Sequence, residues 1–116
     1  MLYCAATTSL CALEVLVHSA GLPTGKVLIA AEISNDLLIE VLKDSDLPPG
    51  WNALAAPKST KDLGTRWAVS QRTAVLSVPS TIVPHERNFL INPLHINFSK
   101  IKFKPPEPFV FDPRLK

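Results

Sequence analysis

Apolar residues dominate the first nineteen positions, and their grouping predicts a short strand followed by a helix. Residues 1–5 (MLYCA) read as a buried strand, because apolar and aromatic side chains are followed at once by polar ones. A Thr or Ser side chain at positions 7–9 then caps a helix that runs to about Ser19, where AGLPTG ends it. The chain is expected to open with a strand and a buried helix.

Two further apolar segments predict strands. Residues 26–33 (KVLIAAEI) have the continuous, β-branched pattern of a core strand. A turn at residues 34–36 closes it, and residues 37–42 (LLIEVL) either extend this strand or form another. The segment 44–58 is dense in Pro and turn residues and predicts a surface loop.

The second half of the chain predicts one helix and then mainly strands. Residues 59–72 suit a helix capped at Ser59 or Thr60, although Gly64 weakens it by about 1 kcal/mol relative to alanine. Extended segments broken or ended by prolines follow at residues 73–80, 88–93 and 100–113. This order predicts an α+β fold with a mixed, strongly twisted β-sheet and a few helices.

Length and composition indicate a single globular domain over residues 1–116, since 47% of the residues are hydrophobic and 19% are charged. A net charge of +2 is too small to argue for nucleic-acid binding. No segment predicts a membrane span or a signal peptide. Cys4 and Cys11 lack the spacing of a zinc site and read as reduced core thiols on separate elements, which favours the cytoplasm.

Glu14 is the unusual residue of the first helix, because burying a carboxylate is costly unless another group pairs with it or uses it. Helical spacing places His18 on the same face, so one interpretation is an exposed ion pair worth about a few tenths of a kcal/mol. The other is a carboxylate at a pocket wall that stabilises developing positive charge on a substrate. The residue pattern leaves both open.

Other polar residues have two interpretations each. Tyr3 is a core aromatic residue or a side chain that stacks on a flat ring. Ser80, at a strand end, caps a turn or binds a phosphate or a ribose. Asn88 and Asn92 are turn formers or amides that orient a ligand. The three histidines form no metal set with the carboxylates, and the four dispersed glycines make no phosphate loop, which disfavours kinases, P-loop enzymes and Rossmann dehydrogenases.

These segments, in this order, resemble the RES domain family, the toxin half of bacterial toxin-antitoxin pairs. The resemblance covers essentially the whole chain and runs through LYCAATTSLCALEVLVH, DLPPGW, LGTRWA, AVLSVPSTIVP, NFLINPLH and PFVFDPRL. It implies a fold like that of ADP-ribosyltransferases. It also implies an enzyme that breaks the bond between nicotinamide and ribose in NAD, by phosphorolysis, hydrolysis or transfer of ADP-ribose.

The resemblance also implies roles for four residues. Glu14 in LEVLVH matches the family's glutamate and Ser80 in VPS its serine, so both are expected to be catalytic. Ser80 is also expected to hold a phosphate or a ribose hydroxyl of NAD. Tyr3 in LYCA is expected to pack against the nicotinamide ring, and Asn92 in NP to help bind NAD. NAD is the expected substrate, and no metal is expected.

Family members usually carry a Gly-Arg-Trp type segment upstream of this tyrosine, and its arginine binds the phosphates of the dinucleotide. This chain starts too late to contain it, and Arg66, Arg72 and Arg87 lie in no such motif. An N-terminally short RES domain with an open sheet edge is therefore expected.

Two functions follow from the resemblance. One is an NAD-consuming toxin with a cognate helix-turn-helix (Xre-type) antitoxin, which contacts DNA in the toxin's place. The other is a catalytically impaired module that binds an antitoxin or forms a homodimer.

Overall fold

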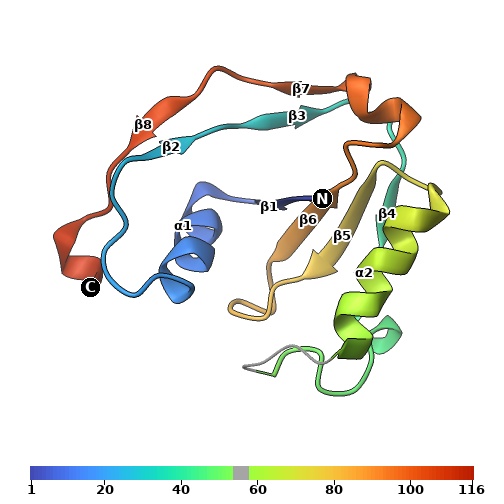
Figure 1. Ribbon diagram of the computed structural model, residues 1–116, viewed down its shortest axis with the longest axis horizontal. Coiled ribbons are helices and arrows are strands. Elements are labelled where there is room, and N and C mark those ends of the chain that lie inside the picture. The colour runs from blue at the N-terminus through green and yellow to red at the C-terminus, as the bar shows by residue number, and fades with distance from the viewer. Residues whose placement is uncertain (54–57) are drawn as a thin grey trace.

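A four-stranded sheet forms the centre of the protein in the computed structural model, which describes residues 1–53 and 58–116, apart from the side chain of Ser59 (Figure 1). Its strand order is β1 (Leu2–Ala5), β6 (Arg87–Ile91), β5 (Val75–Pro79) and β4 (Ile39–Val41). The first two pairings are antiparallel and the β5–β4 pairing is parallel. Together with two α-helices, this mixed sheet confirms the predicted α+β class.

Helix α2 (Lys58–Ser70) covers one face of the sheet. Trp67, only 2% exposed, packs against Leu76 of β5 and Leu90 of β6, which lie directly opposite each other and therefore share a face. The indole N–H of Trp67 donates a hydrogen bond to Thr73 Oγ1 at 3.0 Å, so its one polar atom is satisfied. The opposite face carries the second cluster of buried residues, formed by Leu37, Ala74, Val75, Ile91 and Ile101.

The start of α2 differs from the prediction. The helix already includes Lys58, so positions 59 and 60 lie inside it and not at the predicted cap position. Thr60 Oγ1 is buried and has no hydrogen-bond partner among the residues that the structure describes. Positions 54–57 of the predicted surface loop lie outside the described residues. At its other end α2 stops before Gln71, whose φ of 58° is left-handed and cannot continue the helix.

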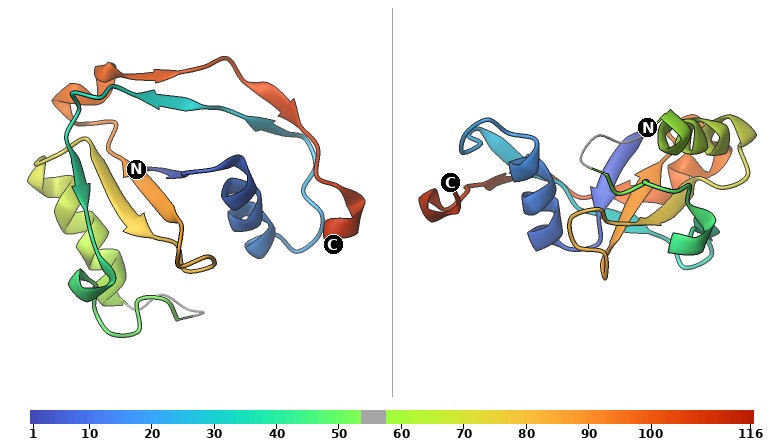
Figure 2. Two further views of the ribbon diagram at one scale, coloured as in Figure 1. Left: turned by 180° about the vertical axis from the view of Figure 1, so that it is seen from behind. Right: turned by 90° about the horizontal axis from the view of Figure 1, so that it is seen from below.

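The predicted core strand at residues 26–33 is wrong, because this segment forms two short strands away from the central sheet. Strand β2 (Lys26–Leu28) pairs with β8 (Glu107–Phe109), and β3 (Ala31–Ile33) pairs with β7 (Ile101–Phe103). These four strands form a long two-stranded ribbon, here called the arm, which arches beside the sheet (Figure 2). Val27 and Ile29 are 58% and 51% exposed, so an apolar run here marks a ribbon and not a core strand.

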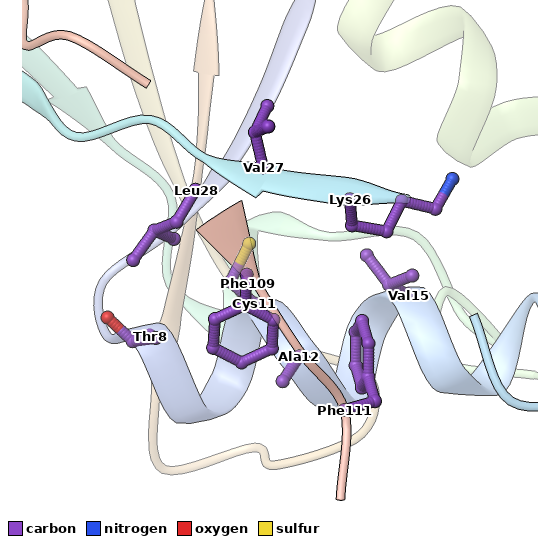
Figure 3. Close-up of a pocket in the computed structure, with 9 residues that line it drawn as sticks. All are labelled: Thr8, Cys11, Ala12, Val15, Lys26, Val27, Leu28, Phe109 and Phe111. Atoms are coloured by element: carbon purple, nitrogen blue, oxygen red, sulfur yellow. The ribbon is translucent and has the colours of Figure 1, made fainter. Parts of the chain in front are cut away.

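Helix α1 (Thr8–Val17) follows β1 and begins at a predicted cap, since Thr7 Oγ1 accepts a hydrogen bond from the amide of Leu10 at 3.1 Å. The arm holds one side of this helix. Figure 3 shows Cys11 and Val15 of α1 facing Phe109 and Phe111 across an apolar cavity of about 80 Å³. The two Phe rings meet edge to face, with centroids 5.0 Å apart. The arm explains why α1 is apolar over so much of its surface.

Cys4 on β1 and Cys11 on α1 are free, half-buried thiols on separate elements. Burial raises the pKa of the Cys4 thiol above its ordinary value, and the neighbouring Cys11 raises it further. None of the helices in the described part of the chain is long and apolar enough to cross a membrane.

Candidate functional site

Glu14 lies in the middle of α1 and reaches the end of the central sheet. Its Oε1 accepts hydrogen bonds from Ser80 Oγ at 3.1 Å and from Asn88 Nδ2 at 2.7 Å. Both donors come from distant parts of the sequence, 66 and 74 positions away. Glu14 is half-buried, whereas His18 is exposed, and no ion pair joins the two among the described residues. Among the described residues, the structure therefore does not form the Glu14–His18 ion pair of the first interpretation and instead holds Glu14 in a hydrogen-bonded polar group.

Ser80 is fully buried at the end of β5 and uses all of its hydrogen-bonding capacity. Its Oγ accepts hydrogen bonds from the amides of Ile82 and Val83, both at 3.1 Å. Because a hydroxyl oxygen has two lone pairs and one proton, this arrangement directs the proton toward Glu14. Ser80 thus caps the turn after β5, as one of the two interpretations proposed, and also orients the carboxylate.

Asn88 lies on β6, opposite Ala5 of β1 and Val78 of β5. The sequence offered Asn88 and Asn92 without distinguishing them. Alternation could not separate them, because each is two residues from the core residue Leu90 and is therefore expected on the same face of the sheet. What the alternation could not supply was that α1 meets this face beside Asn88.

Tyr3 is 74% exposed, so the prediction that β1 is a buried strand is wrong. Within the residues that the structure describes, the strand lies at the edge of the sheet and pairs with β6 alone. Tyr3 is paired with Leu90 and Ala5 with Asn88, which makes Tyr3 a diagonal neighbour of Asn88 on the same face. The exposed tyrosine and the hydrogen bond to Glu14 therefore lie on one side of the sheet.

A cleft of about 340 Å³ is lined by residues of β1 and of the arm. Its lining comprises residues 3–8, Cys11, residues 28–31, Ile33, Phe89 and Ile91. Phe89 and Ile91 project to the face opposite Leu90, because neighbouring residues of a strand alternate in direction. Glu14 and Ser80 are not part of this lining, so the cleft is separate from the carboxylate.

Asn92 lies apart from Glu14, and its side chain is engaged elsewhere. Its Nδ2 donates to the carbonyl of Ala68 at 3.1 Å, and its Oδ1 accepts from the amide of Leu94 at 3.0 Å. It is four positions from Asn88 in the sequence, roughly 13 Å along an extended chain. Asn92, which is only 4% exposed, joins the end of α2 to the turn after β6.

Of the arginines named above, Arg72 and Arg87 are held by other residues. Arg72 makes two 3.0 Å hydrogen bonds to the carboxylate of Glu40, and these raise the pKa of the arginine. Arg87 donates to Ser77 and to the carbonyl of Leu42, which joins β4, β5 and β6. Arg66 is exposed on α2.

In the described part of the chain, no group of three His, Cys, Asp or Glu side chains is placed to hold a metal ion.

Comparison with known proteins agrees with the predicted resemblance. The sequence model of the RES domain family matches residues 1–112. The chain is 41% identical over 119 residues to the "Prs ADP-ribosylating toxin" of Sphingobium sp. (strain YBL2), covering 99% of this chain and 74% of that protein. It is 40% identical over 117 residues to "Toxin Res" of Yersinia enterocolitica, covering 99% and 77%. A third relative, "Toxin Res" of Pseudomonas putida, is 34% identical over 110 residues, covering 89% and 70%. The chain therefore belongs to the RES domain family.

Proposed function

We propose that this protein is a toxin that consumes NAD by breaking the bond between nicotinamide and ribose. The observation that carries the proposal is the half-buried carboxylate of Glu14, held by hydrogen bonds from Ser80 and Asn88. Family membership supports it, as does the printed name of the Sphingobium relative, which describes an ADP-ribosylating toxin.

The chemistry of this bond favours a carboxylate. As nicotinamide leaves, positive charge develops on the ribose, and a negative group beside the sugar stabilises this transition state more than the ground state. Oε1 of Glu14 already accepts two hydrogen bonds, whereas Oε2 has no hydrogen-bond partner within the described part of the chain. We assign Oε2 to the ribose. Because the carboxylate is held before substrate arrives, little reorganisation is needed during the reaction.

The other predicted site residues take different parts in this proposal. Tyr3 presents an exposed ring on the same face of the sheet and stacks on the flat nicotinamide. Ser80 acts on Glu14 and not on a phosphate, because both of its lone pairs accept backbone hydrogen bonds. Asn92 has no part, since both polar atoms of its side chain bond within the protein.

The acceptor of the ADP-ribosyl group is phosphate, water or a protein side chain. The name of the Sphingobium relative supports transfer of ADP-ribose over hydrolysis. We further propose that the protein acts in the cytoplasm without a metal and that a helix-turn-helix antitoxin of the Xre type neutralises it. Direct binding of nucleic acid is not part of the proposal, in keeping with a net charge of only +2.

Release of nicotinamide from NAD by the purified protein tests the proposal. We expect turnover, and we expect Glu14→Gln to reduce the rate about 100-fold or more, because the substitution removes the negative charge from the transition state. Glu32→Gln is the matched control, since Glu32 is exposed on β3 and faces Lys104 at 3.7 Å. Assays with phosphate, without it and with a candidate protein acceptor identify the acceptor. A wild-type protein that releases no more nicotinamide than Glu14→Gln would reject the proposal.

A second candidate is a catalytically impaired module that binds an antitoxin or a second copy of itself. The observation that favours it is the outer edge of β1, which pairs with no other strand in the described part of the chain and borders the 340 Å³ cleft. Such an edge is a template for another strand. Co-purification with a helix-turn-helix antitoxin, or a dimer in light scattering, in a protein without NAD turnover would select this function.

A further inference from the structure

Asn88 holds one polar atom in an unfavourable position. Its Nδ2 donates the 2.7 Å hydrogen bond to Glu14, but its Oδ1 is buried and has no partner among the described residues. Buried polar atoms in native proteins nearly always have a hydrogen-bond partner, because an unpaired one loses its interaction with water and gains nothing. An asparagine here therefore needs a reason beyond the stability of the strand.

The carboxylate of Glu14 supplies that reason. Turning the amide of Asn88 by half a revolution would bring Oδ1 against Glu14 Oε1, and two acceptors repel each other. The orientation that serves Glu14 is thus the one that leaves Oδ1 unpaired. The opposite residues, Ala5 and Val78, are apolar, and asparagine is disfavoured in strands, so an apolar side chain would suit the sheet better. A residue type that is unfavourable for its local structure, as asparagine is at this strand position, is typical of functional sites.

Ser80 alone would not fix the carboxylate. A single hydrogen bond to Oε1 leaves the group free to rotate about its last bond, whereas two donors from different elements restrict it. Ser80 approaches from the end of β5 and Asn88 from within β6. With Oε1 held from both, Oε2 faces a defined direction.

We infer that Asn88 is a positioning residue that fixes Glu14 so that Oε2 meets the ribose of NAD. This inference rests on the proposed function and adds to it a residue that acts through Glu14 without touching the substrate. It predicts that removing Asn88 lowers kcat and changes KM little, because binding contacts remain while the carboxylate loses its alignment.

The first test is Asn88→Leu, which keeps the approximate shape and removes both polar atoms. We expect the protein to fold, because removing the unpaired Oδ1 offsets at least part of the lost hydrogen bond to Glu14, while kcat falls about 10-fold to 100-fold. Asn35→Leu is the matched control, since Asn35 is exposed in a turn and should leave kcat unchanged. Unchanged kcat in a folded Asn88→Leu protein would overturn the inference and leave the proposed function standing.

Asn88→Asp provides a second test should the leucine variant fail to fold. The introduced carboxyl donates a hydrogen bond to Glu14 when protonated and repels it when ionised. We expect activity relative to wild type to rise as pH falls, with no such change in Asn35→Asp. A pH profile parallel to that of the wild type would overturn the inference. A wild-type protein without NAD turnover would instead reject the proposed function, and this inference with it.

Discussion

The ammonium group of Lys116 donates a hydrogen bond to the backbone carbonyl of Leu16 at 2.6 Å, although the two residues are 100 positions apart. Lys116 also reaches the carbonyl of Ser19. The last carbonyls of a helix have no partner within it and form its negative end, where a cation is favourable. The far end of the chain thus secures the helix that carries Glu14 (Figure 1).

Replacing Lys116 by methionine should therefore destabilise the protein. We expect Lys116→Met to lower the free energy of unfolding by about 1 kcal/mol, because the carbonyls of Leu16 and Ser19 lose the ammonium donor and the end of α1 loses a favourable charge. Urea unfolding followed by circular dichroism measures the change. Lys61→Met is the control, since Lys61 is exposed on α2 and its ammonium makes no hydrogen bond within the described part of the chain. Equal losses in the two variants would contradict the role of Lys116.

Gly64 offers a stabilising substitution. It lies within α2, where a Cβ would meet Leu90 Cδ2 at 3.8 Å and Met1 Cε at 3.9 Å, both ordinary contact distances. Glycine costs a helix about 1 kcal/mol relative to alanine, so Gly64→Ala should raise the free energy of unfolding by about that amount. Gly50→Ala should instead lower the free energy of unfolding, since φ of Gly50 is +77° and a residue with a Cβ is strained there. A thermal unfolding midpoint that falls for Gly64→Ala would contradict this prediction.

Arg87 should be sensitive even to a conservative substitution. Its guanidinium donates to Ser77 Oγ at 3.0 Å and to the carbonyls of Ser77 and Leu42, and a lysine cannot reproduce this fork. We expect Arg87→Lys to lower the free energy of unfolding by about 1–3 kcal/mol, because buried acceptors lose a charged donor. Arg66→Lys, on the exposed side of α2, should change it by less than about 0.5 kcal/mol. Chemical denaturation of both variants beside the wild type measures the two changes in the free energy of unfolding.

The buried thiol of Cys4 predicts a loss of stability at alkaline pH. Burial raises its pKa in the folded protein, with a further contribution from Cys11. The folded state therefore holds this proton more strongly than the unfolded state does. In the unfolded state the cysteine titrates at about pH 8.5. The contribution of Cys4 to stability is complete below that pH and is lost as pH rises through the folded-state pKa.

The variant Cys4→Ala has no thiol to ionise. Its free energy of unfolding should fall less than that of the wild type between about pH 8 and pH 10. The loss in Cys11→Ala should be intermediate, because this substitution removes only the smaller of the two causes that raise the pKa of Cys4. Unfolding curves at several pH values provide the measurement. Parallel losses in all three proteins would show that other groups dominate the alkaline range.

Helix α1, helix α2 and strand β5 were predictable because neighbouring residues decide them. The hydroxyl of Thr7 caps α1 from three positions away, and β5, which ends at Pro79, lies within the predicted segment 73–80. Glu14 and Ser80 also stood out, one as a carboxylate in an apolar helix and the other as a hydroxyl at a strand end. Each of these signals lies within a few residues of the feature it predicts.

The arm, the exposure of Tyr3 and the hydrogen bond of Asn88, and not of Asn92, to Glu14 were decided only by tertiary structure. Residues 26–33 look like a core strand, yet their partners are the late strands β7 and β8 and not the central sheet. Asn88 is distinguished from Asn92 only by α1, which the chain brings against β6 across 74 positions. An apolar run or a single amide indicates which kinds of interaction its residues can make in any fold. The partners that these residues meet depend on which distant segments pack together to bury the apolar surface.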